Sequence, residues 1–150
     1  MPELPEVETT LRGVRPFIQE ERIQEVLIRS PRLRWPIPKE SLQQLSGQTF
    51  HTLQRRGKYL LFTTYTGTLI LHLGMSGRLA ILKPPLPAGR HDHMDILFKN
   101  HFILRFTDPR RFGALLWTDS DPSCHPLLIK LGIEPLSRHF NTHYLRKISS

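Results

Sequence analysis

The amino terminus places a potential nucleophile next to carboxylates. The chain begins Met-Pro-Glu-Leu-Pro-Glu, and removal of Met1, which is usual before a small residue, would leave Pro2 as a free secondary amine. An α-amino group has a pKa of about 7.7 to 8.0, so a fair fraction is unprotonated near neutral pH. Such an amine can attack carbon and become an iminium, which accepts electrons as lysine Schiff bases do. Alternatively, Pro2 and Pro5 simply open a helix, and these six residues alone favour that interpretation.

Three further segments combine residue types that are unusual for ordinary turns. Residues 55–58, Arg-Arg-Gly-Lys, suit the close approach of a phosphate backbone, although a solvated run of charges would look the same. Residues 72–77 carry Met75 between two glycines at an expected hairpin tip, where a methionine is either exposed or, more commonly, folded back into the core. Residues 108–113 present paired arginines beside Phe112. Apolar side chains and arginines on loops are what a protein needs to unstack a base step and fill the gap.

Composition and charge narrow the class of partner. The chain has 150 residues, the length of a single domain, with 21 Lys and Arg against 13 Asp and Glu, a net charge of +8 and a pI near 10.3. This balance predicts a polyanionic partner. Arginine outnumbers lysine by 15 to 6, and its planar fork suits phosphates and base edges. A generic basic protein remains the alternative.

The cysteine count and hydropathy pattern predict where the protein works. Cys124 is the only cysteine, so the chain can form neither an internal disulfide nor a multi-cysteine zinc site. The sequence has no apolar run of signal-peptide or membrane-spanning length. We therefore expect a cytoplasmic protein without a membrane partner.

An amphipathic helix is expected to carry the amino terminus. Val7, Leu11 and Val14 form one apolar stripe from about Pro5 to Arg15, and Pro16 should end the helix. A strand over 22–30 and a short helix over 38–45 should follow.

Residues 49–119 have the composition of a β-domain. Short runs rich in β-branched and aromatic residues alternate with turn signals, and the longest loop is 83–90. The predicted strands are 49–56, 58–65, 68–73, 78–82, 92–99, 102–107 and 114–118. Close spacing and tight turns favour an antiparallel β-sandwich. Short helices are predicted over 125–131 and 141–148, giving a mainly β (α+β) fold with an N-terminal helix and short flanking helices.

Taken together, these motifs resemble the bacterial formamidopyrimidine-DNA glycosylase family, known as Fpg or MutM. The similarity covers nearly the whole chain, in family order and spacing. The matching segments are 2–8 (PELPEVE), 32–36 (RLRWP), 57–60 (GKYL), 72–77 (HLGMSG), 91–93 (HDH) and 108–113 (DPRRFG). The sister endonuclease VIII branch usually has glycine where Leu4 stands and lacks the pattern of Met75 and Phe112.

The resemblance implies a catalytic role for residues near the amino terminus. Pro2 would attack C1′ of a flipped, damaged nucleotide, displace the oxidised purine and allow β- and δ-elimination. Glu3 would serve as general acid and base, and Glu6 would hold the amine or a water. Lys58 would lie near the lesion and its flanking phosphate.

The resemblance also implies contacts with double-stranded DNA that holds an oxidised purine or an abasic site. Met75 and Phe112 would enter the base stack, and Arg110 would hydrogen-bond the orphaned cytosine. Arg111, His72 and His91 would contact phosphates. His91 and His93, with Asp92 and Asp95, could instead be read as a metal cluster, but the family uses no catalytic metal.

The chain departs from the family pattern after residue 150. Family members continue into a helix-two-turn-helix module and a Cys₄ zinc finger, which holds their structural zinc; residues 1–150 match only the N-terminal catalytic domain. We therefore expect no cofactor in this chain, a monomer, and weak or absent turnover by the isolated domain. If Met1 is retained, the Pro2 nitrogen is a tertiary amide and cannot react.

Three functional hypotheses follow. The first is a bacterial, nucleoid-associated repair enzyme, a DNA glycosylase with AP lyase activity. The second is a non-catalytic module that binds damaged DNA through Met75, Arg110 and Phe112. The third, a basic RNA-binding β-domain, has only the charge in its favour.

Overall fold

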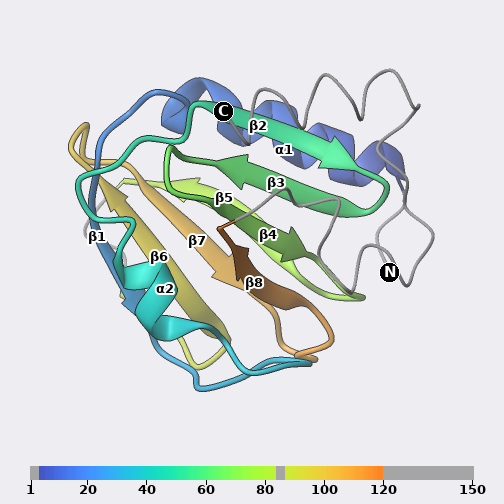
Figure 1. Ribbon diagram of the computed structural model, residues 1–150. Coiled ribbons are helices and arrows are strands. Elements are labelled where there is room, and N and C mark those ends of the chain that lie inside the picture. The colour runs from blue at the N-terminus through green and yellow to red at the C-terminus, as the bar shows by residue number, and fades with distance from the viewer. Residues whose placement is uncertain (1–3, 84–86, 120–150) are drawn as a thin grey trace.

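Two four-stranded antiparallel sheets face one another in the computed structural model, which describes residues 4–83 and 87–119 (Figure 1). The first sheet has the order β1 (Ile23–Ile28), β6 (Asp92–Phe98), β7 (Ile103–Thr107), β5 (Arg78–Leu82). The second has the order β2 (Thr52–Arg56), β3 (Tyr59–Thr63), β4 (Thr68–His72), β8 (Ala114–Thr118). The predicted mainly β sandwich is confirmed, and its strand boundaries agree with the predicted ones to within a few residues.

Helix α1 (Leu4–Ile18) closes one side of the sandwich. Its predicted apolar stripe is confirmed, since Val7, Leu11 and Val14 are all buried in the main core. The helix packs against β2 and β5, which are edge strands of the two different sheets. It therefore covers backbone edges that would otherwise be open for pairing.

The predicted end of α1 at Pro16 is wrong, because the helix continues through this proline to Ile18. A proline inside a helix has no N–H to donate to the preceding turn. Here the next residues are held by tertiary contacts. Ile18 is fully buried, and the Phe17 ring meets Phe102 edge-on at a centroid distance of 4.9 Å. Burial of apolar surface outweighs the missing hydrogen bond.

Apolar side chains fill the space between the sheets and also line the outer face of the second sheet. In the main core, the Phe50 ring packs edge-on against Phe62 at 5.4 Å and against Phe98 at 6.3 Å. The outer cluster consists of Tyr59, Leu61, Ile70, Ala114 and Leu116, with Trp35 packed against it. Every residue of β3 and β4 is buried, so the central strands of this sheet form the rigid support for the loops at their ends.

The glycine-rich segment 74–77 does not form the predicted hairpin. It leaves β4 in the second sheet and enters β5 in the first, where β5 pairs with β7. Segment 108–113 also crosses between sheets, from β7 to β8. We call these segments the first and second crossover. Turn residues mark where a chain reverses, but the packing of apolar faces decides which strands pair.

The remaining helical element is α2 (Lys39–Gln43), which is shorter than predicted and contacts β1. No helix among the described residues is long and apolar enough to cross a membrane. Pro2, Glu3, Cys124 and the helices predicted over 125–131 and 141–148 lie outside the described residues.

Candidate nucleic-acid interface

The two crossovers meet at a cleft of about 660 Å³. Its lining residues come from three distant parts of the sequence: Leu33, Arg34, Gly74, Met75, Arg110, Arg111 and Phe112. Three of these side chains are arginines, and all three residues are exposed. The cleft therefore combines positive charge with apolar surface, a combination that suits a partner with phosphates and stacked rings.

Met75 and Phe112 stand at this cleft with about half of their surface in solvent. Met75 is 50% exposed and Phe112 is 46% exposed, so both are among the large exposed apolar residues of the described chain. The alternative in which Met75 folds back into the core is wrong. The Arg110 guanidinium lies 5.4 Å from the centre of the Phe112 ring, within reach of a cation–π contact. The structure thus brings Met75, Arg110 and Phe112 to one surface.

The crossovers approach each other so closely that glycine is required at the contact. A Cβ on Gly74 would lie 2.6 Å from the backbone carbon of Phe112 and from the amide nitrogen of Gly113. Gly74 also has a φ of +63°, a conformation that side chains disfavour. Gly74, just before Met75, and Gly113, just after Phe112, therefore allow two backbones to touch.

His72, a predicted phosphate contact, is almost fully buried at the end of β4. Its Nδ1 accepts a hydrogen bond of 3.0 Å from the Gly74 N–H, and its ring packs on Tyr59 at 4.7 Å. Burial lowers the pKa of His72, and the nearby positive charges of Arg34 and Lys58 lower it further. The ring is therefore neutral near pH 7. In that state Nδ1 supports the first crossover and Nε2 carries the proton.

The three cationic residues of segment 55–58 differ in their contacts and in their burial. The Arg55 Nε donates to the Glu8 carboxylate at 3.0 Å and its Nη1 donates to the Gly57 carbonyl at 3.0 Å. Arg56 is buried, whereas Lys58 is half-buried. The predicted phosphate-binding role is therefore contradicted for the buried Arg56, and it stays a prediction for Arg55 and Lys58.

The Glu8–Arg55 ion pair also places the start of α1. It ties the second turn of α1 to the end of β2, and the Arg55 hydrogen bond is the main cause of the lowered pKa of Glu8. In Figure 1 the first turn of α1, the β2–β3 turn and the first crossover lie at the same end of the sandwich. Glu6, in the first turn of α1, is exposed.

His91 lies at the base of the second crossover. Its carbonyl accepts the Asp108 N–H at 2.9 Å, and its half-buried ring accepts a hydrogen bond of 3.3 Å from the Arg90 Nε. His93 is fully buried, with Nδ1 2.6 Å from the Ser30 hydroxyl and Nε2 2.8 Å from the Asp108 carbonyl oxygen. Both ring nitrogens of His93 are thus engaged.

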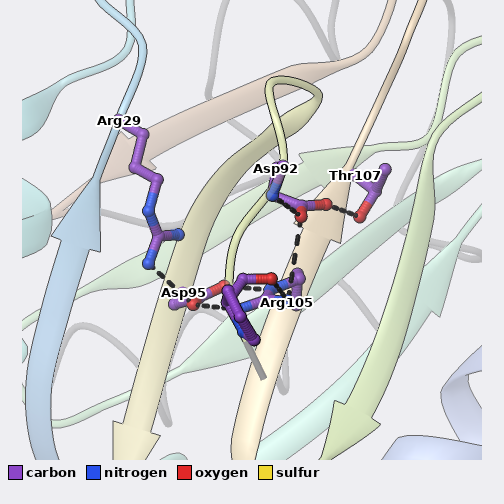
Figure 2. Close-up of polar contacts among 7 residues, drawn as sticks. Arg29, Asp92, Asp95, Arg105 and Thr107 are labelled. Atoms are coloured by element: carbon purple, nitrogen blue, oxygen red, sulfur yellow. Dashed lines mark hydrogen bonds and ion pairs between the residues drawn. The ribbon is translucent and has the colours of Figure 1, made fainter. Parts of the chain in front are cut away.

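The carboxylates near these histidines form an ion-pair cluster on the outer face of the first sheet. Asp95 binds Arg29 at 2.9 Å and accepts two hydrogen bonds of 2.9 Å from Arg105 (Figure 2). Asp92 accepts the Thr107 hydroxyl at 2.6 Å and the Gly89 N–H at 2.7 Å. These bonds fix the segment that leads into His91. Within residues 4–83 and 87–119, no group of three or more His, Cys, Asp or Glu residues is placed to hold a metal ion.

Two sets of residues at or near the cleft received no role from the sequence. Leu33 and Arg34 line it because the 32–36 turn is bound to the second crossover: the Arg34 N–H donates to the Gly113 carbonyl, and the Arg111 Nη1 donates to the Arg32 carbonyl. Ser76 and Asp108 lie beneath the crossovers. All four occur within the family motifs, which was the only signal in the sequence that could have identified them.

Comparison with known proteins places this chain in one protein family. The family model described as formamidopyrimidine-DNA glycosylase N-terminal domain matches residues 1–115. The chain belongs to the formamidopyrimidine-DNA glycosylase family.

Individual relatives agree with this assignment. The chain is 54% identical to a formamidopyrimidine-DNA glycosylase of Nitrosococcus oceani over 149 residues, which cover 99% of this chain and 55% of the relative. It is 57% identical to one of Cellvibrio japonicus over 145 residues, covering 97% of this chain and 53% of the relative. The chain therefore spans about half the length of these curated relatives.

Solved structures show the same fold. The Lactococcus lactis enzyme, non-covalently bound to DNA that contains an AP site, matches with a TM-score of 0.77 at 33% identity, over 86% of this chain and 49% of that one. A structure of MutM in complex with DNA containing carbocyclic 8-oxo-G matches with a TM-score of 0.76 at 32% identity, over 86% of this chain and 48% of that one.

Proposed function

We propose that this chain is the N-terminal part of a base-excision-repair enzyme, a DNA glycosylase that removes oxidised purines and cleaves the resulting abasic site. The observation that carries this proposal is the cleft where Met75, Arg110 and Phe112 meet. Two half-exposed apolar side chains beside arginines can replace an extruded nucleotide in the base stack. Family membership and the DNA-bound relatives support the same function.

In the proposed chemistry, the amine of Pro2 attacks C1′ of the extruded nucleotide as the bond from C1′ to the damaged base breaks. The C1′–O4′ bond then breaks, with a proton delivered to O4′, and the sugar ring opens to an iminium. The iminium makes the C2′ proton acidic, so that elimination can cut the strand on the 3′ side and then on the 5′ side. Glu3 moves protons to and from the sugar and base, and Glu6 holds the amine or a water. Lys58 contributes positive charge beside the flanking phosphate.

In the proposed complex with DNA, Met75 and Phe112 enter the stack and Arg110 hydrogen-bonds the base opposite the gap. Arg111, which lines the cleft, and His91, at the base of the second crossover, would contact phosphates. His72 would act differently from a cation, because its lowered pKa leaves it neutral. A neutral imidazole with an engaged Nδ1 can donate a single hydrogen bond to a phosphate oxygen through Nε2.

Borohydride trapping tests the catalytic proposal. Mass spectrometry first establishes a sample without Met1. Reduction during incubation with an 8-oxoguanine or abasic duplex is then expected to give a covalent adduct, because the iminium is reduced to a stable tertiary amine. A sample that retains Met1, in which the Pro2 nitrogen is a tertiary amide, is the matched control and should lose most of the adduct. Absence of any adduct from the chain without Met1 would overturn the catalytic proposal for this chain.

A second candidate, binding of damaged DNA without catalysis, is favoured by the exposure of Met75, Arg110 and Phe112 at the cleft, because these side chains can meet a base stack without any chemical step. It predicts salt-dependent binding of an abasic duplex that survives Pro2→Gly and causes no nicking. Trapping of an adduct excludes it, whereas tight lesion binding without an adduct or a nick favours it over the catalytic proposal.

A further inference from the structure

The two crossovers are joined by one hydroxyl group. Ser76, in the first crossover, donates through Oγ to the Asp108 Oδ1 at 2.7 Å. The same Oγ accepts a hydrogen bond of 3.1 Å from the Arg110 N–H in the second crossover. A single side chain next to Met75 thus contacts both the start and the tip of the segment that carries Phe112.

The Asp108 carboxylate accepts hydrogen bonds from both crossovers. It is fully buried, and a buried carboxylate needs hydrogen bonds or cations to replace water. Its Oδ1 accepts the Arg111 N–H at 3.2 Å and its Oδ2 accepts the Gly113 N–H at 2.8 Å. The second crossover therefore curves around the Asp108 carboxylate, to which its own N–H groups donate. The Ser76 hydroxyl joins the first crossover to the same carboxylate.

Backbone contact makes this connection stiff. Gly74 touches Phe112 and Gly113 so closely that no Cβ fits between them. Arg111 adopts a positive φ of 59°, which a residue other than glycine keeps only when its surroundings hold it there. The hydrogen bonds from the backbone N–H groups of Arg111 and Gly113 to the Asp108 carboxylate supply that restraint. Movement of either crossover alone would break bonds in both.

We propose that Ser76 and Asp108 are positioning residues that hold Met75 and Phe112 as one preformed wedge. This inference rests on the proposed function, because the wedge is useful only if a gap in a base stack is to be filled. Side chains held in the bound arrangement lose little freedom on binding, so more of the contact energy appears as affinity. Ser76 and Asp108 touch no DNA in this scheme and act through Met75, Arg110 and Phe112.

The test compares Ser76→Ala with two other hydroxyl variants. Ser76→Thr keeps the hydroxyl. Thr64→Val removes a matched hydroxyl at the opposite end of β3 and β4, where the Thr64 Oγ1 also donates to a carbonyl, that of Gly67, and accepts an amide N–H, that of Thr66. Two quantities are measured: hydrogen exchange of the Arg110 and Gly113 amides in the free chain, and the ratio of affinities for abasic and intact duplexes.

Ser76→Ala is expected to accelerate exchange of both amides. It should also lower the abasic-to-intact affinity ratio about tenfold, the effect of losing one hydrogen bond to a charged group. Fluorescence of 2-aminopurine beside the abasic site should fall in parallel, since it reports unstacking. Ser76→Thr should retain most of the ratio and Thr64→Val all of it. In a Phe112→Ala background, Ser76→Ala should cause little further loss.

Three results would overturn the inference, and they can be told apart. Unchanged amide exchange in Ser76→Ala would show that the hydroxyl does not hold the second crossover. Faster exchange with an unchanged affinity ratio would show that the coupling does not serve lesion binding. If the unaltered chain itself does not distinguish abasic from intact duplex, the proposed function fails, and a wedge for base stacks fails with it.

Discussion

Asp95 and Asp108 are both buried carboxylates, but their hydrogen bonds come from different groups. Asp95 is paired with the guanidinium groups of Arg29 and Arg105. Asp108 is held by backbone N–H groups and the Ser76 hydroxyl, although two arginines follow it closely in the sequence. The first arrangement uses cations within the fold. The second satisfies a carboxylate without using the side chains of those two arginines.

This difference shows how one chain separates structural charge from functional charge. At the outer face of the first sheet, arginine charge is neutralised and fixes the segment before His91 (Figure 2). At the crossovers, Arg110 lies over the exposed Phe112 ring, and among the described residues the Arg111 guanidinium donates to the Arg32 carbonyl and to no carboxylate. Their positive charges are thus retained at the cleft, where a polyanion would be attracted to them.

Removing an arginine that pairs with Asp95 should have the largest effect on the free energy of unfolding. Arg105→Ala leaves Asp95 buried with only part of its compensation, and loss of one partner from a buried ion pair typically costs about 3–5 kcal/mol. Urea denaturation measures the change. Arg12→Ala, which removes a partner of Glu8 at the surface of α1, is the control and should cost at most about 1 kcal/mol. Equal losses in both variants would contradict the distinction.

Asp108→Asn should have a smaller effect. The new NH₂ group would face an N–H or O–H donor, leaving at least one buried donor without an acceptor, at a cost of about 1–3 kcal/mol. No buried charge is left unpaired, so the loss should be below that of Arg105→Ala in the same urea experiment. Asp119→Asn makes the same change at an exposed position. A loss larger than that of Arg105→Ala would reverse the order proposed for the two sites.

Lowering the pH should destabilise the fold by protonating Asp95, the carboxylate that is paired with Arg29 and Arg105. Burial raises the pKa of Asp95, but hydrogen bonds from Arg105 and Arg29 outweigh it, and the net shift is downward. A lowered pKa contributes stability above the unfolded value of about 3.9, and this is lost as pH falls through the folded value. The free energy of unfolding should therefore decline below about pH 4, less steeply in Arg105→Ala. Parallel pH curves would indicate that Arg105 does not set this dependence.

Phe112→Ala should have the smallest effect on stability. The side chain is half exposed, so the free energy of unfolding should change by no more than about 0.5 kcal/mol. Its effect should instead appear in the affinity ratio for abasic and intact duplexes, because the wedge is truncated. Tyr65→Ala removes an aromatic side chain that is 91% exposed at the β3–β4 turn and should change neither quantity. A large loss of stability would mean that Phe112 belongs to the core.

The sequence by itself determined the local elements and the residue types of the site. Apolar periodicity located α1, and β-branched runs between turn residues located every strand of the two sheets, because these patterns are read over a few neighbouring residues. The motifs likewise identified Met75, Arg110 and Phe112 as candidates.

Only the tertiary structure decided how these elements meet. It carried α1 past Pro16, because Ile18 is buried in the core, and it turned an expected hairpin into the first crossover, because β5 pairs with β7. It also gave Asp108 the amides of Arg111 and Gly113, whereas Asp95 took the guanidinium groups of Arg29 and Arg105. Such choices depend on contacts between residues far apart in the chain, where apolar faces, close backbone approach and the desolvation of charge must all be satisfied at once.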